Sequence, residues 1–124
     1  MKQLKKEYQS LSGEELAKTC AQISDDNKAE DIVVLDVRGI SSFTDYFIIM
    51  SGRSVRHVQA LAESLEDELR SKRIKTSRAE GLSEGQWVLL DFGDIVAHIF
   101  YHEQRKFYDL EGLWHDAPRV EELP

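Results

Sequence analysis

Cysteine is nearly absent from this sequence of 124 residues, and no long hydrophobic run occurs in it. The single cysteine, Cys20, cannot form a disulfide within the chain, which favours the reducing cytosol. No segment approaches the roughly 20 apolar residues that a membrane-spanning helix needs. The basic N-terminal residues are followed by no apolar run, so we expect no secretory signal. We therefore expect a cytoplasmic protein without a membrane segment.

An excess of positive charge is also missing. Sixteen Lys and Arg stand against 23 Asp and Glu, which gives a formal net charge of −7 at pH 7. Proteins that bind nucleic acid directly need clustered Lys and Arg to neutralise phosphates, so this balance argues against such binding. It favours a basic protein partner that is attracted electrostatically. The same charge also keeps a soluble protein in solution, and composition alone favours this simpler explanation.

The sequence contains no internal repeat, no low-complexity run and no linker between domains. We therefore expect one domain over residues 1–124, with a flexible N-terminal extension (1–10) and a flexible tail (117–124). The apolar content is 41% and the charged content 31%, both ordinary for a soluble globular protein. A chain of this length can bury a core without disulfides or metal ions.

Helix and strand patterns alternate along the chain. Ser12 with Glu15 forms a capping box, which marks the start of a helix. The predicted elements are a helix from Ser12 to residues 25–27, strands over 31–38 and 45–51, a helix from Val55 to about Lys72, a short strand over 74–78, and a last helix that begins near Gln104 or Arg105. This order implies an α/β fold, a single mixed β-sheet domain with packed helices.

The segment from Trp87 to Tyr101 predicts a β-hairpin whose two-residue turn is Gly93–Asp94. Alternation then divides its side chains between two faces. One face is almost entirely apolar and is predicted to be core: Val88, Leu90, Phe92, Ile95, Ala97, Ile99 and Tyr101. On the other face the predicted pairs are Trp87 with Phe100, Leu89 with His98, and Asp91 with Val96.

This second face carries Trp, Asp and His among aliphatic residues. Asp91 and His98 would be costly to bury without partners, so we expect the face to be half-exposed. Its composition is typical of a protein-binding hot spot, although a Trp at the start of a strand is also a common packing residue. In the last helix we expect an apolar stripe against the sheet: Phe107, Leu110, Leu113 and Trp114.

Three segments together identify a family resemblance. They read DYFIIMSGRSVRHVQALA from Asp45, WVLLDFGDIVAHIF from Trp87 and FYDLEGLW from Phe107. In this order the segments resemble the ribosomal silencing factors of bacteria and organelles, the RsfS or Iojap family, and the resemblance covers roughly Ile23 to Val120. The positions that match the family's motifs are Trp87, Asp91, Gly93, Asp94, His98, Arg105, Tyr108 and Trp114, whereas Gly112 stands where many relatives carry a charged residue.

The resemblance implies a ribosomal silencing factor. Such proteins bind protein fourteen of the large ribosomal subunit, block joining of the small subunit and repress translation under nutrient limitation, and the organellar members assist large-subunit assembly. It also implies possible peripheral contact with ribosomal RNA and a homodimer when the protein is free. Together with the hairpin pattern, it predicts these interface residues: Trp87, Leu89, Asp91, Asp94, His98, Phe100, Arg105 and Tyr108.

The family resemblance further implies a nucleotidyltransferase-like fold, so an enzyme or a nucleotide-binding domain is the alternative. Such enzymes need paired carboxylates on a strand to hold metal. Behind the Ser51–Ser54 turn, the next acidic residues are Glu63, Glu66 and Asp67, which fall in a predicted helix. His98 and His102, if on one strand, lie about 13 Å apart, too far to share a zinc ion. We therefore expect no catalytic residues, no cofactor and no metal site.

Raising the salt concentration should slow association with a basic partner if the acidic charge steers the encounter. Exposed charges are screened within roughly 8 Å at physiological ionic strength. The on-rate should therefore fall more than the off-rate rises, as stopped-flow measurements with large subunits would show. An on-rate that is independent of salt would leave the charge of −7 as a solubility feature.

Overall fold

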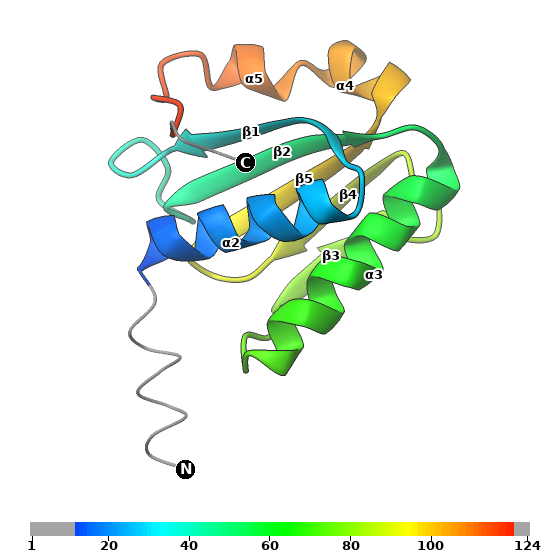
Figure 1. Cartoon of the computed structure of the whole chain (residues 1–124). Helices are drawn as coiled ribbons and strands as arrows, with labels where there is room; N and C mark the ends of the chain where they lie inside the picture. The colour runs from blue at the N-terminus through cyan, green and yellow to red at the C-terminus, as the bar shows by residue number, and fades with distance from the viewer. Residues whose placement is uncertain (1–11, 121–124) are drawn as a thin grey trace.

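The computed structural model describes residues 12–120, which form one mixed five-stranded sheet with helices on both faces (Figure 1). The strands are β1 (Glu30–Asp36), β2 (Tyr46–Gly52), β3 (Arg78–Glu80), β4 (Trp87–Asp91) and β5 (Ile95–Tyr101), and the helices are α2 (Gly13–Asp26), α3 (Val55–Ser71), α4 (His102–Tyr108) and α5 (Leu110–Leu113). The sheet order is β1-β2-β5-β4-β3. Only β2 and β5 pair in parallel. The predicted single mixed sheet is confirmed.

Capping side chains set the starts of the two long helices. The Ser12 hydroxyl accepts a hydrogen bond from the Glu15 N–H at 3.1 Å, and Ser54 does the same for the N–H of His57 at 3.0 Å. Both predicted helices are therefore confirmed. The predicted strand over 74–78 is wrong. Ile74 is buried and its N–H donates to the Leu69 carbonyl, so this residue belongs to the end of α3. Strand β3 begins only at Arg78.

Helices α2 and α3 lie on one face of the sheet, and α4 and α5 cross the other (Figure 1). The first layer encloses the larger core, in which Cys20 is fully buried. Burial raises the pKa of the Cys20 thiol to about 12, so it packs as a small apolar group. Between the layers every residue of β2 is buried, as expected for a strand covered on both faces. No helix within residues 12–120 is long and apolar enough to cross a membrane.

Residues 117–120 run alongside β1 and complete the second layer. The Asp36 N–H donates to the Pro118 carbonyl at 2.8 Å, and the Val120 N–H donates to the Val34 carbonyl at 2.8 Å. These residues of the tail that we expected to be flexible therefore pair with β1, which would otherwise be a bare edge strand. The extension 1–10 and residues 121–124 lie outside the described residues.

Candidate functional site

The β4–β5 hairpin has the predicted turn and register. The Phe92 N–H donates to the Ile95 carbonyl at 2.9 Å, which leaves Gly93 and Asp94 as the two-residue turn. Gly93 adopts a φ of +95°, which a glycine reaches without strain. The Asp94 carbonyl accepts hydrogen bonds from the N–H groups of Asp45 and Tyr46, so the exposed turn is tied to the start of β2. The predicted cross-strand pairs are confirmed: Trp87 with Phe100, Leu89 with His98, and Asp91 with Val96.

The two faces of this hairpin differ in burial. The predicted core face is confirmed, and it packs against α2 and α3 with only Tyr101 partly exposed. On the opposite face, the side chains of Trp87, Leu89 and Asp91 from β4 are half-buried. Tyr108 of α4 packs beside Trp87 and remains 47% exposed. We refer to these four residues, Trp87, Leu89, Asp91 and Tyr108, as the β4 surface.

The β5 half of the same face is not exposed. His98 and Phe100 are buried, with 4% and 0% of their surfaces accessible. The prediction that they contribute exposed interface contacts is therefore wrong for the isolated chain. The physical reason is the place of β5, which is the central strand of the sheet, between β2 and β4, and is covered on this face by α4.

The Trp87 side chain packs on the buried rings of His98 and Phe100, which we refer to as the aromatic base. Its indole stacks on the Phe100 ring, with centroids 5.0 Å apart and planes 26° apart, and contacts the Tyr108 ring at 4.7 Å. Its N–H donates to Nδ1 of His98 at 3.1 Å. The indole is therefore held in one orientation and stays half-buried.

His98 is held as a neutral imidazole. Burial lowers its pKa from the usual 6.5 to about 4. Because Nδ1 accepts from Trp87, the ring proton belongs on Nε2. That nitrogen is buried and has no hydrogen-bond partner among residues 12–120. His98 thus supports Trp87 and lies out of reach of an external partner.

The last helical segment is broken at Asp109, which adopts a left-handed conformation with φ 47°. Its carboxylate accepts a hydrogen bond from the N–H of Gly112 at 3.2 Å and starts α5. A Cβ at Gly112 would lie 2.2 Å from this carboxylate, which explains why a larger residue would disturb the cap.

The break changes which side chains pack. Phe107 and Leu113 are 78% and 74% exposed, so the predicted apolar stripe is wrong at both positions. Leu110 is buried, and Trp114 packs against the Phe47 ring at 5.1 Å, as predicted. Tyr108, the residue next to Phe107, contacts Trp87.

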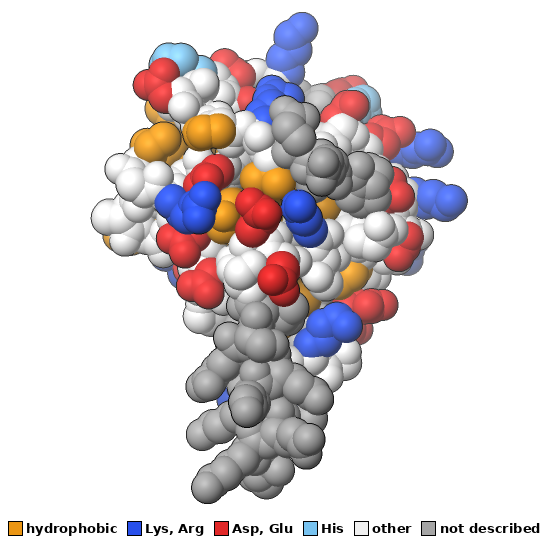
Figure 2. All heavy atoms as spheres, turned by 60° about the vertical axis from the view of Figure 1, so that its left-hand side comes forward, with side chains coloured by type: hydrophobic (Ala, Val, Ile, Leu, Met, Phe, Trp, Pro, Cys, Tyr) orange, Lys and Arg blue, Asp and Glu red, His pale blue; other side chains and the backbone are white. Residues whose placement is uncertain are grey.

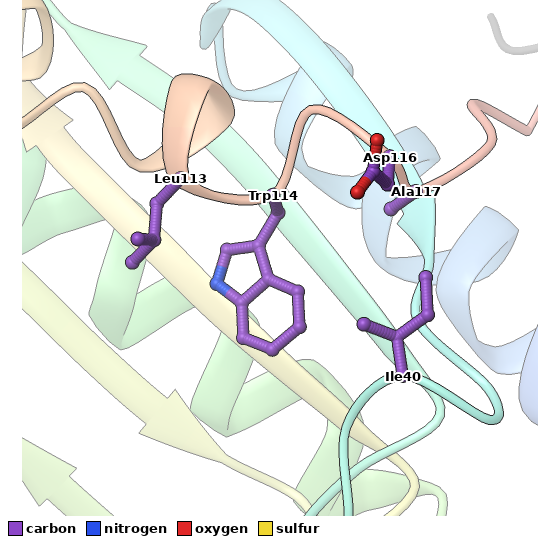
Figure 3. Close-up of a pocket in the computed structure, with 5 residues that line it drawn as sticks. All are labelled: Ile40, Leu113, Trp114, Asp116 and Ala117. Carbon is purple, nitrogen blue, oxygen red and sulfur yellow. The ribbon is translucent and has the colours of Figure 1, made fainter.

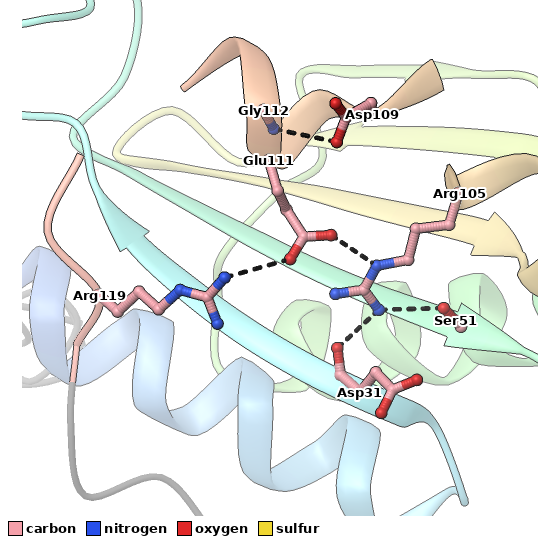
Figure 4. Close-up of polar contacts among 7 residues, drawn as sticks. All are labelled: Asp31, Ser51, Arg105, Asp109, Glu111, Gly112 and Arg119. Atoms are coloured by element: carbon pink, nitrogen blue, oxygen red, sulfur yellow. Dashed lines mark hydrogen bonds and ion pairs between the residues drawn. The ribbon is translucent and has the colours of Figure 1, made fainter. Parts of the chain in front are cut away.

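Arg105 anchors this segment across the sheet (Figure 4). Its Nε donates to Glu111 at 2.8 Å, and one terminal nitrogen donates to the Asp31 carbonyl at 2.6 Å and to the Ser51 hydroxyl at 3.0 Å. The side chain is only 13% exposed. Glu111 also pairs with Arg119 at 3.6 Å. These contacts hold α4 and α5 in place, and the interface contact expected of Arg105 stays a prediction for a mostly buried side chain.

Sequence reasoning missed the neighbours on β3. Arg78 pairs with Asp91 and Glu80 with Leu89, so both side chains share the face of the β4 surface. They are exposed and form an ion pair at 3.0 Å. Because the strand was predicted over 74–78 and not over Arg78–Glu80, these two neighbours of β4 were not expected. The antiparallel pairing of β3 with β4 identifies them.

The Ser51–Ser54 turn is the site that the alternative prediction, an enzyme or a nucleotide-binding domain, would use. Here the Ser51 hydroxyl accepts from Arg105, and Ser54 caps α3. A Cβ at Gly52 would lie 2.8 Å from Val58, so the turn packs closely on the helix. Within residues 12–120 no group of three His, Cys, Asp or Glu side chains is placed to hold a metal ion.

Comparison with known proteins identifies clear relatives. The family described as "Ribosomal silencing factor during starvation" matches residues 10–124. A ribosomal silencing factor from Halalkalibacterium halodurans is 42% identical over 111 residues, covering 90% of this chain and 95% of that protein. One from Bacillus subtilis is 43% identical over 108 residues, covering 87% and 92%. A crystal structure of a Chromobacterium violaceum protein superposes with a TM-score of 0.81 at 35% identity, covering 84% of this chain and 87% of that one.

Acid should destabilise the protein through His98. Between the folded pKa of about 4 and the usual value of 6.5, the unfolded chain binds the proton more readily. This contribution is complete above pH 6.5 and is lost as the pH falls toward 4, by up to about 3 kcal/mol. Urea unfolding over this range should show a shallower pH slope for His98→Gln.

The exposed His102 provides the control, because His102→Gln should keep the slope of the unsubstituted protein. The carboxylates titrate alike in all three proteins, so the difference between slopes isolates one imidazole. Equal slopes for His98→Gln and the unsubstituted protein would contradict the burial of a neutral His98.

Proposed function

This chain belongs to the family of ribosomal silencing factors, and on that premise we propose that it binds the large ribosomal subunit through protein fourteen. Bound there, it occupies the place of the small subunit and blocks subunit joining. Translation then falls under nutrient limitation. This mechanism is steric occlusion, so it needs neither a cofactor nor turnover.

The observation that carries the proposal is the β4 surface. Trp87 and Tyr108 present aromatic faces beside Leu89, and the indole is fixed from below by Phe100 and His98. Interface hot spots are enriched in such aromatic residues, and a side chain already held in one orientation loses little entropy on binding. The same exposed surface is where we place self-association of the free protein as a homodimer.

Charge supports a basic partner. The chain carries a net charge of −7, and Asp91 and Asp94 lie at the turn end of the β4 surface. On the side of the molecule shown in Figure 2, acidic and basic side chains lie interspersed around exposed hydrophobic groups. An acidic protein is attracted to a basic ribosomal protein and repelled by RNA phosphates, so any contact with ribosomal RNA stays peripheral. We place the protein in the cytoplasm, where its partner is assembled.

The enzymatic alternative has no specific observation in its favour. Glu63, Glu66 and Asp67 lie within α3, at least nine residues beyond the Ser51–Ser54 turn. That turn is occupied by contacts within the chain. The arrangement therefore supports binding better than it supports phosphoryl chemistry.

The protein should sediment with free large ribosomal subunits and not with small subunits or intact 70S-type ribosomes. In the joined ribosome the proposed binding face is covered by the small subunit, so no site is open. Tagged protein mixed with separated subunits and resolved on a sucrose gradient provides the measurement. Equal recovery with both subunits, or with neither, would contradict the proposal.

Trp87→Ala should weaken binding to the large subunit by about 2 kcal/mol, roughly thirtyfold. The side chain is half-buried, so some folding stability is lost as well, and affinity must be measured well below the melting temperature. Val88→Ala is the matched control, because Val88 adjoins Trp87 on β4 but faces the core. It should lower the melting temperature without changing affinity. Unchanged affinity in Trp87→Ala would show that the partner binds elsewhere.

A further inference from the structure

A cleft opens between the loop that joins β1 to β2 and the segment that follows α4 (Figure 3). Five residues line it: Ile40, Leu113, Trp114, Asp116 and Ala117. Its volume is about 270 Å³. Pockets for small molecules measure roughly 300–1,000 Å³ and enclose their ligands. This cleft is smaller and shallow, which suits a side chain projecting from another protein.

The walls of the cleft are exposed apolar groups. Leu113 is 74% and Ile40 49% accessible, and the two come from opposite sides with the Trp114 indole between them (Figure 3). In Figure 2, hydrophobic side chains likewise reach the surface on this side of the molecule. Grouped apolar exposure, as opposed to scattered single residues, marks interaction sites. The break at Asp109 exposes Leu113, so the local backbone creates this feature.

Packed rings beneath the surface connect the cleft with the β4 surface. Trp114 contacts Phe47 at 5.1 Å, and Phe47 contacts His98 at 5.0 Å. His98 in turn accepts the hydrogen bond of the Trp87 indole at 3.1 Å. All of these side chains lie on the face of the sheet opposite α2 and α3. The cleft and Trp87 therefore open on the same face of the sheet, so one partner that covers this face can contact both.

We propose that the cleft receives an apolar side chain of the basic ribosomal protein that occupies the β4 surface, with a neighbouring Lys or Arg of that partner at Asp116. The inference rests on the proposed function and adds a second contact site to it. Charge selects this occupant: the Asp116 side chain is 82% exposed at the rim, and the chain carries a net charge of −7.

Leu113→Ser and Ile40→Ser test the cleft directly. Both residues are exposed, so thermal melts should match those of the unsubstituted protein. Each substitution should weaken binding to purified large subunits about fivefold. Asp116→Asn should slow association and reduce its dependence on salt. Phe43→Ser is the control, since Phe43 is 92% exposed on the loop of Ile40 but does not line the cleft.

The outcomes separate the cleft from the proposed function. Full affinity in Leu113→Ser and Ile40→Ser, together with weak binding by Trp87→Ala, would overturn the cleft and leave the proposed function standing. An equal loss in Phe43→Ser would move the contact to the loop tip and also overturn it. A changed dimer mass in sedimentation velocity, with subunit affinity unaltered, would make a second copy the occupant. If the unsubstituted protein binds no large subunits, both proposals fail.

Discussion

The parallel pairing of β2 with β5 is the constraint on which the rest of the structure depends. Parallel neighbours need a long connection, and here α3, β3 and β4 lie between them in the chain. With α2, helix α3 covers one face of the sheet. The other face must be covered by whatever follows β5, which is a short, broken helical segment and residues 117–120. That segment covers β1, β2 and β5, and β4 remains half-open.

The covering segment is held by polar contacts that reach far along the chain. Arg105 joins α4 to the Asp31 carbonyl and the Ser51 hydroxyl, 74 and 54 residues earlier. Asp109 turns the chain, so that Leu110 and Trp114 pack inward while Leu113 points to solvent. These contacts decide both how the aromatic base beneath Trp87 is buried and where the apolar cleft opens. The exposed side chains of this face are therefore positioned by residues far from them in the sequence.

Features carried by neighbouring residues were predictable from the sequence. The Gly93–Asp94 turn and the alternation around it set the register of β4 on β5, and Ser12 with Glu15 sets the start of α2. The burial of His98 was not predictable from the hairpin, because it depends on β2 lying beside β5. The left-handed turn at Asp109 lies within an apparently continuous helical pattern, so Phe107 was misplaced. The contacts of Arg105 with Asp31 and Ser51 were not predictable, because these partners lie 74 and 54 residues away in the sequence.

The central claim is that the half-open face of β4 is the side that meets the ribosome. An electron cryomicroscopy structure of the protein bound to the large subunit tests it most directly. We predict that the Trp87 and Leu89 side chains contact protein fourteen, that Tyr108 lies at the edge of that contact, and that α2 and α3 face solvent. A complex in which α2 and α3 meet the ribosome, with β4 left open to solvent, would contradict it.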